Sequence, residues 1–289
     1  SVSIQEGHFV SANSLGFMGG YPTSRHYLSC SVIAGKDDAM QRDDWYSTSR
    51  NPEHIAAAEA IGDYAARRAL SRLGARKIKT CKVPVLFEAP LAASLIGNFA
   101  HAASGGSLYR KTSFLLDCLG RRIFPENMRI SERPHLPGGL ASSMFDNDGV
   151  ATRDRELVMD GVLQGYFLSA YTARKLGMAT TGNAGGCHNL IVQSGQHDFS
   201  GLLKKMGRGL LVTELLGQGV NYVTGDYSRG AAGYWVEGGE IQHAVEEITI
   251  AGNLRDMFLN IVDVGNDVVV RGSRQVGSIL VAEMKIAGV

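Results

Sequence analysis

The chain has 289 residues, and its 29 basic and 28 acidic side chains leave a formal net charge of +1. This balance provides no basic field for a nucleic acid backbone. A mean hydropathy of -0.04, without an apolar run of membrane-spanning length, argues against a membrane role. Glycine, with 36 residues, exceeds its average share, which indicates many turns between short strands. We therefore expect a β-rich globular protein whose partners include neither nucleic acid nor a membrane.

The cysteines give a guide to the cellular compartment. Four of them lie far apart and form no C-x-x-C pair: Cys30, Cys81, Cys118 and Cys187. This spacing is typical of neither a zinc knuckle nor a dense disulfide framework, and it favours a reducing cytoplasm. The sequence starts at Ser1 without a signal-peptide pattern, so we expect that a longer chain has lost its N-terminal region.

The N-terminal part alternates polar and apolar residues. Residues 9–46 do so in short runs broken by a Gly-Gly-Tyr-Pro stretch at 19–22, a pattern that predicts β-hairpins. A long helix should follow, because Asn51 is a good N-cap and Pro52 suits the first helical position. Its apolar stripe ends before Gly74.

A buried strand followed directly by a helix is the stretch around which we expect the chain to be organised. Residues 83–87 form a short apolar run, and Pro90 again suits a first helical turn, which predicts a strand and then a helix over 91–103. Such junctions often hold catalytic groups, yet this helix offers only Asn98 and His101 as polar candidates. We expect a first domain at 1–110, containing the hairpins, the long helix and this strand-helix core, and a β-rich domain at 111–289.

The middle of the chain contains loops that could be mistaken for binding motifs. Residues 129–139 predict a long loop or lid, and residues 157–169 predict a hairpin around an Asp-Gly turn. The Asp-Asn-Asp-Gly stretch at 146–149 lacks the later ligands of a calcium loop, so we interpret it as a turn. The glycine-rich stretch at 180–186 leads into a predicted strand at 190–192 rather than into a helix, which disfavours a phosphate site.

The last third of the sequence alternates short strands with glycines. Glycines at this spacing are typical of a closed or strongly curved sheet. We predict helices over 200–207 and 252–260. The predicted strands are 210–215, 231–236, 241–245 and 268–270.

A cysteine nucleophile is one alternative for catalysis. Cys187 precedes His188, and His197 precedes Asp198, so a thiolate with a histidine base can be considered. Adjacent residues on a strand point to opposite faces, however, and His197 lies in a predicted polar turn. A Cys-His pair is therefore the weaker interpretation.

Several motifs resemble one family. The run at 224–241, Thr-Gly-Asp-Tyr-Ser-Arg-Gly-Ala-Ala-Gly-Tyr-Trp-Val-Glu-Gly-Gly-Glu-Ile, and the run at 247–254 closely resemble the PmbA/TldD family, in its PmbA branch, also called TldE. The stretches at 171–177, 181–186 and 283–288 are similar to the same branch. The resemblance implies an α+β fold whose β-rich C-terminal domain has a curved or barrel-like sheet and a few flanking helices. It also implies a preceding α/β domain that this sequence lacks.

The resemblance further implies a cytoplasmic, heteromeric metalloprotease that acts on unfolded peptides, in the maturation of a peptide antibiotic and the degradation of an antitoxin. In that family the TldD-type subunit binds zinc and the PmbA-type subunit does not. When the His-Glu-x-x-x-His helix and the C-terminal cysteine of TldD are laid on this chain, the ligand positions fall on residues that cannot serve as metal ligands: Gly97, Asn98, Ala102 and Val276.

His101 lies one residue from the second histidine position, which rotates it by about a hundred degrees around the helix. It cannot simply replace that ligand, so we expect no metal or other cofactor in this chain, and no general base. Zinc is expected in the TldD-type partner.

Three functions remain open. The first is a non-catalytic PmbA-type subunit, with a TldD-type subunit and an unfolded peptide as partners and a homodimer when the chain is alone. The second is a self-contained cysteine-dependent hydrolase, and the third is a gyrase-modulating adaptor, which the family's name of modulator of DNA gyrase suggests. The residues expected to line a peptide groove are Asn98, His101, Asn183, Asp226 and Tyr227.

Overall fold

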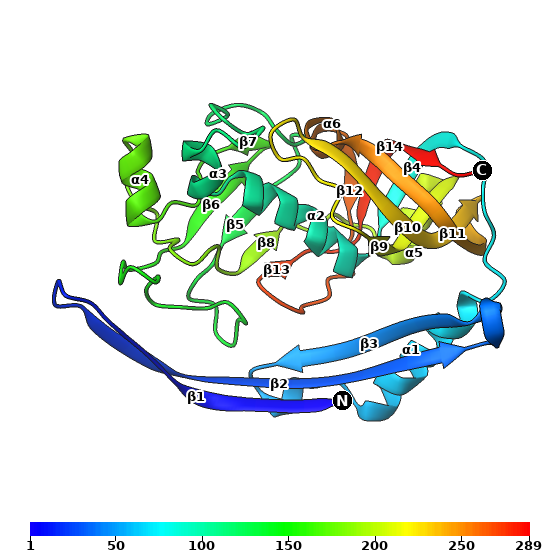
Figure 1. The fold of residues 1–289 in the computed structure, drawn as a ribbon, viewed down its shortest axis with the longest axis horizontal. Helices are drawn as coiled ribbons and strands as arrows, with labels where there is room; N and C mark the ends of the chain where they lie inside the picture. Colours follow the sequence, from blue (N-terminus) through cyan, green and yellow to red (C-terminus); the bar gives the residue numbers. More distant parts are fainter.

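The computed structural model describes the backbone of residues 1–289 and every side chain except that of Asp38. A long three-stranded antiparallel sheet runs along one side of the molecule, apart from the two other sheets (Figure 1). Its strands are β1 (Val2–Ala12), β2 (Met18–Ala34) and β3 (Gln41–Ser49). A short 3-10 helix, η1 (Asp37–Ala39), joins the last two. The β-hairpins predicted for this region are confirmed.

The first hairpin turns earlier than predicted. The side-chain oxygen of Asn13 accepts hydrogen bonds from the backbone N–H groups of Leu15 and Phe17, at 3.0 and 3.3 Å, and so closes the turn. Residues 19–22, predicted to break the strand, lie inside β2 and pair with β1. Glycine suits position 20 because a Cβ there would lie only 2.7 Å from the carbonyl oxygen of Phe9.

The long helix also begins later than predicted. Asn51 does act as a cap, accepting from the N–H of Glu53 at 3.0 Å, but it starts only the 3-10 helix η2 (Pro52–His54). Ile55 then has an extended backbone, and α1 (Ala58–Ser71) starts three residues further on. α1 packs on β2 and β3, and its buried side chains are Ile61, Ala65 and Ala69.

Charged side chains connect this layer to the rest of the protein. Arg68 of α1 donates to both carboxylate oxygens of Glu88, at 2.6 and 3.1 Å, and its Nε lies 3.2 Å from Asp43. Arg271 lies over the rings of Trp45 and Tyr46, with its guanidinium carbon 3.7 and 4.0 Å from their centroids. Planar two-point pairing and stacking of this kind favour arginine.

The larger part of the molecule contains a closed barrel. Five strands form a ring in the order β11-β10-β9-β4-β14, because β11 pairs back with β14, and β12 extends the sheet beside β14. The predicted barrel-like sheet is therefore confirmed. The bounds are β4 (Cys81–Phe87), β9 (Gly209–Leu216), β10 (Asp226–Glu237), β11 (Glu240–Asn253), β12 (Ile261–Val264) and β14 (Ile279–Ala287).

One glycine shows how the strands bend to close the ring. The pairing of β10 with both neighbours shifts register next to Gly233, as in a β-bulge. A Cβ at this position would overlap the carbonyl oxygen of Leu211 on β9. The interpretation of the glycines in the last third as bending positions agrees with this contact.

A second sheet lies beside the barrel (Figure 1). Its order is β13-β8-β5-β6-β7, with β5 (Ile130–Glu132), β6 (Arg155–Met159), β7 (Val162–Leu163), β8 (Leu190–Val192) and β13 (Arg274–Gln275). The helices of this part are α2 (Ala89–Ala102), α3 (Gly105–Tyr109), α4 (Ala170–Leu176), α5 (Phe199–Met206) and α6 (Leu254–Leu259). None of the helices in the described residues has the length and apolarity needed to cross a membrane.

Most predicted elements of this part are confirmed, including the hairpin of β6 and β7 and the helices α5 and α6. The strand predicted at 268–270 is wrong, because these residues lie in the loop between β12 and β13. The carboxylate of Asp267 holds this loop by accepting from the backbone N–H and the hydroxyl of Ser278, at 2.8 and 2.6 Å.

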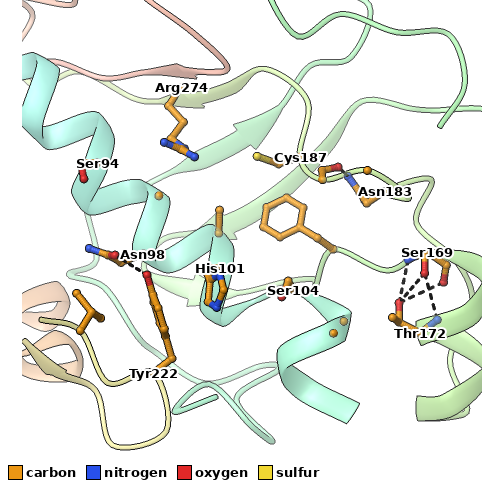
Figure 2. A pocket seen from close by; sticks show the side chains of 18 of the residues that line it. Ser94, Asn98, His101, Ser104, Ser169, Thr172, Asn183, Cys187, Tyr222 and Arg274 are labelled. Atoms are coloured by element: carbon orange, nitrogen blue, oxygen red, sulfur yellow. Dashed lines mark hydrogen bonds between the residues drawn. The ribbon is translucent and has the colours of Figure 1, made fainter. Parts of the chain in front are cut away.

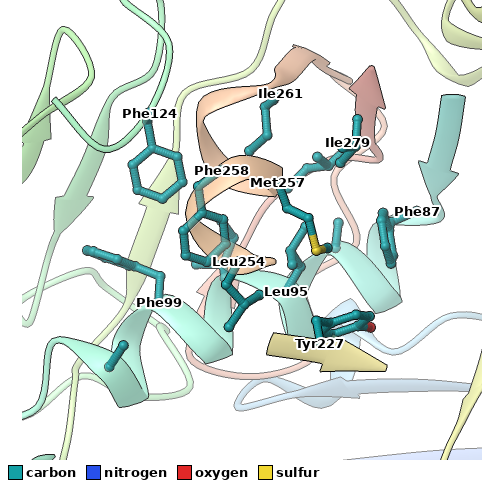
Figure 3. Packing of buried hydrophobic residues seen from close by; sticks show 14 of the residues in the cluster. Phe87, Leu95, Phe99, Phe124, Tyr227, Leu254, Met257, Phe258, Ile261 and Ile279 are labelled. Atoms are coloured by element: carbon teal, nitrogen blue, oxygen red, sulfur yellow. The ribbon is translucent and has the colours of Figure 1, made fainter. Parts of the chain in front are cut away.

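The larger of two apolar clusters joins the barrel to the second sheet. α2 and α6 contribute Phe99 and Phe258 to it, and Phe87 of β4 lies nearby (Figure 3). The ring of Phe124 lies between those of Phe99 and Phe258, with centroids 5.5 and 4.9 Å away. The core is thus continuous across residue 110, and α2 is held rigidly between the two sheets.

Candidate functional site

A cavity of about 590 Å³ lies along the exposed side of α2 (Figure 2). The helices α2 and α3, the segment 183–187, Tyr222 and two arginines form its walls. Several residues singled out from the sequence line it: Gly97, Asn98, His101, Asn183 and Cys187. A pocket of this size is large enough for a ligand of several residues.

The helical period of α2 explains which side chains reach the cavity. Leu95, Ile96 and Phe99 are buried in the core. On the other side, the cavity is lined by residues at the spacing i, i+3, i+4 and i+7: Ser94, Gly97, Asn98 and His101. The core therefore fixes the direction of the polar groups, and the strand-helix junction sets their position.

Tyr222 covers the polar face of α2. Its hydroxyl donates to the side-chain oxygen of Asn98 at 2.9 Å, and its ring lies against that of His101 with centroids 4.0 Å apart. Partial burial lowers the pKa of His101, and the charge of Arg110 lowers it further. Its imidazole is therefore neutral at pH 7.

Two arginines enter the same cavity without a counter-charge. Arg274 of β13 extends toward α2 (Figure 2) and donates to the carbonyl oxygen of Ala93 at 3.4 Å. The Nε atoms of Arg274 and of Arg229 on β10 are buried and have no hydrogen-bond partner among the described residues. Neither side chain forms an ion pair with a described carboxylate, and the described lining contains neither Asp nor Glu. The cavity is thus cationic, although the chain as a whole is nearly neutral.

The four positions expected to correspond to a metal site do not fit a zinc ion. Gly97 has no side chain, and a Cβ there would lie 2.9 Å from Nη1 of Arg274, so a guanidinium lies against this turn of the helix. The side-chain oxygen of Asn98 already accepts a hydrogen bond from Tyr222. Ala102 and Val276 are 0% exposed and lie in the core. Zinc binds thiolate, imidazole and carboxylate groups, and these residues supply none.

The part of the chain that the structure describes also contains no group of three or more His, Cys, Asp or Glu side chains placed to hold a metal ion. A cation near Gly97 would in addition meet the positive charge of Arg274, which repels it. We therefore derive no metal chemistry for this chain.

Asn183 connects the cavity to a buried ionic cluster that the sequence did not reveal. Its amide donates to Glu132 at 2.8 Å, and its oxygen accepts from Arg155 at 2.8 Å. Arg155 also pairs with Glu132 at 2.7 Å, and the backbone N–H of His188 donates to that carboxylate at 2.7 Å. These partners are 23 to 56 residues apart in sequence, so no local pattern could have brought them together.

Cys187 lines the cavity but has no base beside it. Burial raises the pKa of its thiol, and the charge of Arg274 offsets this only in part. The Nδ1 atom of His188 lies 3.2 Å from Glu132, and that of His197 lies 2.7 Å from Asp263. Among the described residues, neither histidine forms a hydrogen bond with Cys187. The geometry therefore does not provide the thiolate-imidazole pair that cysteine catalysis needs.

Asp226 and Tyr227, also expected in the groove, lie elsewhere. Tyr227 is 2% exposed and is part of the apolar core. Asp226 is exposed and accepts from the hydroxyl of Thr224 at 2.6 Å. Arg229 of the same motif lines the cavity instead.

The fold defines the class of the protein: an α+β chain with a closed five-stranded barrel and a cavity beside α2. Residues 1–73 match the central domain of the PmbA/TldA metallopeptidases, and residues 80–288 match their C-terminal domain. The chain belongs to the PmbA/TldD family, and the resemblance seen in its motifs is confirmed.

Bacterial relatives support this assignment. The metalloprotease PmbA of Escherichia coli O157:H7 is 52% identical over 279 residues, covering 96% of this chain and 62% of the relative. A PmbA homologue from Haemophilus influenzae is 50% identical over 289 residues, covering 100% of this chain and 64% of the relative. The chain thus spans less than two thirds of the length of these relatives.

Solved structures share the fold. A crystal structure from Thermotoga maritima, named as a modulator of a DNA gyrase, is 36% identical, has a TM-score of 0.88, and is matched over 96% of this chain and 65% of its own. TldE from Thermococcus kodakarensis is 24% identical, with a TM-score of 0.85 over 99% of this chain and 68% of its own. The second likeness concerns the fold alone.

Proposed function

We propose that this chain is the non-catalytic, PmbA/TldE-type subunit of a heteromeric, cytoplasmic metalloprotease. The main support is that the four positions expected to hold metal ligands have residues that do not bind zinc: Gly97, Asn98, Ala102 and Val276. A TldD-type partner would supply the zinc ion and the water that it activates. Relatives named as metalloproteases support the peptidase context.

The chain's contribution would be to hold an unfolded peptide substrate. The open edge of β1 supports this role, since β1 pairs with β2 on one side and with no other described strand. Along β1 all residues except Ser11 are exposed. An extended peptide can add to such an edge through backbone hydrogen bonds, as in other peptide-binding sheets. The substrates that the family resemblance suggests are a peptide antibiotic precursor and an antitoxin.

The test measures each subunit alone and in a mixture. This protein and a TldD-type subunit are assayed separately and together for bound zinc and for cleavage of an unfolded peptide. We expect one zinc per partner subunit, none stoichiometric with this chain, and cleavage that needs both proteins. Size measurements on this chain alone test for a homodimer. Stoichiometric zinc in this chain, with activity lost on chelation, would contradict the proposal.

A gyrase-modulating adaptor is the second candidate, because two solved structures of the same fold are named for gyrase modulation. A pull-down that compares gyrase subunits with a TldD-type partner separates the two functions. Capture of gyrase without the TldD-type protein favours the adaptor. For the cysteine hydrolase, unchanged activity of Cys187→Ala would remove the remaining alternative.

A further inference from the structure

We propose that the cavity beside α2 binds a carboxylate group of a peptide, with Arg274 and Arg229 as its anchors. The inference rests on the proposed function for the source of the carboxylate, a peptide. The site itself is argued from the charges, the burial and the shape of the cavity.

The two arginines face the cavity without a carboxylate partner among the described residues. Arg68 and Arg155 do have such partners, since Arg68 pairs with Glu88 at 2.6 Å and Arg155 pairs with Glu132 at 2.7 Å. Arg271 also lacks a carboxylate partner, but its guanidinium stacks on the rings of Trp45 and Tyr46. The Nε donors of Arg274 and Arg229 are buried without a hydrogen-bond partner among the described residues, as are those of Arg68 and Arg271. A buried donor without a partner is unfavourable, and arginine cannot avoid that cost by losing its proton. An anion in the cavity would compensate both positive charges.

The two positive charges face the same cavity. Arg229 of β10 and Arg274 of β13 both line it, together with Tyr222. Two cations that line one cavity without an acidic side chain favour the binding of an anion there.

The remaining walls fit a peptide carboxylate better than an inorganic dianion. The planar guanidinium fork matches the two oxygens of a carboxylate. Phe167 and Val220 supply apolar surface, and the cavity of about 590 Å³ is larger than a single ion needs. The C-terminal end of α2 at His101 and the N-terminal end of α3 at Ser104 both border the cavity, so their opposite partial charges favour neither charge state of the ligand.

The glycine at position 97 gives the anchor its place. A Cβ there would approach Nη1 of Arg274 to 2.9 Å, so a larger residue would displace the guanidinium from its place against the helix. In this place Arg274 points into the cavity (Figure 2).

The test is calorimetric binding of short peptides to the intact chain alone. The probes are N-acetylated tetra-alanine with a free C-terminal carboxylate, the same peptide as an amide, and the amide with one internal glutamate. Inorganic phosphate is the fourth probe. We expect at least one of the two carboxylate peptides to bind about tenfold or more tightly than the neutral amide, which corresponds to about 1.4 kcal/mol. Preference between them identifies a C-terminal or a side-chain carboxylate as the ligand.

Variants locate the binding to the cavity. Arg274→Gln and Arg229→Gln should each weaken carboxylate binding about tenfold, whereas Arg121→Gln, at an exposed position outside the lining, should leave it unchanged. Unfolding curves show whether each variant is folded. If Arg274→Gln does not fold, Arg229→Gln alone tests the proposal. Equal binding of acid and amide, equal losses in all three variants, or tighter binding of phosphate would each overturn the proposal. This test involves no partner and no cleavage assay. A failure here would therefore not contradict the proposed subunit role, which the zinc and cleavage measurements test separately.

Discussion

Two charged regions border the segment 183–188, and they differ in how their charges are satisfied. Around Glu132, which is 1% exposed, the carboxylate accepts from Arg155 and Asn183 at 2.7 and 2.8 Å and from the backbone of His188 at 2.7 Å. Burial alone would raise the pKa of Glu132, but these partners outweigh it and hold the pKa below its usual value. On the cavity side, the guanidinium groups of Arg274 and Arg229 have no such partners among the described residues.

This difference separates a structural cluster from a binding site. In the first region the chain itself supplies every charge, so the cluster can stabilise the fold without a ligand. In the second, two cations face a hollow and the compensating charge must come from outside. Removing a charge from the paired cluster should therefore lower the free energy of unfolding. Removing a cation from the cavity should instead weaken ligand binding.

The largest effect is expected from Glu132→Gln. The substitution leaves Arg155 buried without its counter-charge, and breaking a buried pair in this way costs about 3–5 kcal/mol. Urea unfolding measures this loss, and Glu240→Gln, at an exposed strand end, should change the free energy of unfolding by less than about 0.5 kcal/mol. A loss of under about 1 kcal/mol for Glu132→Gln would show that the cluster does not stabilise the fold.

The pH dependence of that loss identifies its cause. A carboxylate whose pKa is lowered by folding stabilises the protein above its unfolded pKa, near the ordinary value of 4.5, and the contribution disappears as the pH falls through the folded pKa. The difference in unfolding free energy between the wild type and Glu132→Gln should therefore be constant above about pH 6 and shrink below about pH 4. A difference that is independent of pH would point to lost packing instead.

Local patterns in the sequence predicted much of the fold but little of this contrast. The hairpins, the strand before α2, and the bending glycines depend on residues near each other in sequence, so their signals could be interpreted directly. Asn98 and His101, expected from the sequence to line a peptide groove, both line the cavity. The loop at 268–270 has strand-like residues, and only Asp267, which bonds to Ser278 eleven positions away, explains why no strand forms.

The charged regions depend on long-range contacts. Glu132 and Arg155 are 23 residues apart, and Gly97 and Arg274 lie in elements at opposite ends of this part of the chain. Gly97 was recognised from the sequence only as a position without a metal ligand. The structure adds the guanidinium that lies against it, and neither periodicity nor motif spacing contains that information.

A smaller effect is expected from Gly97→Ala, which changes the cavity without weakening the helix. Alanine is favoured over glycine inside a helix by up to about 1 kcal/mol, while the new Cβ must push the guanidinium of Arg274 aside. We therefore expect no loss in the free energy of unfolding and an affinity for the carboxylate peptide that falls about fivefold. Gly62→Ala in α1 is the matched control, since nothing lies within 4 Å of its Cβ position. Equal affinities of the two variants for the carboxylate peptide would show that Arg274 does not take part in binding.

The smallest effect is expected from His101→Ala at the edge of the cavity. The exposed imidazole loses only its contact with the ring of Tyr222, so the free energy of unfolding should fall by less than about 1 kcal/mol at pH 8. Folding lowers the pKa of His101 below 6.5, so the unfolded state binds a proton more readily and the wild type loses stability as the pH falls below that value. Because alanine cannot take up this proton, the difference between the two proteins should narrow or reverse at about pH 5. Urea unfolding at both pH values measures it, and a difference that widens on acidification would mean that the folded cavity accepts the imidazolium, contrary to a site built around two unpaired arginines.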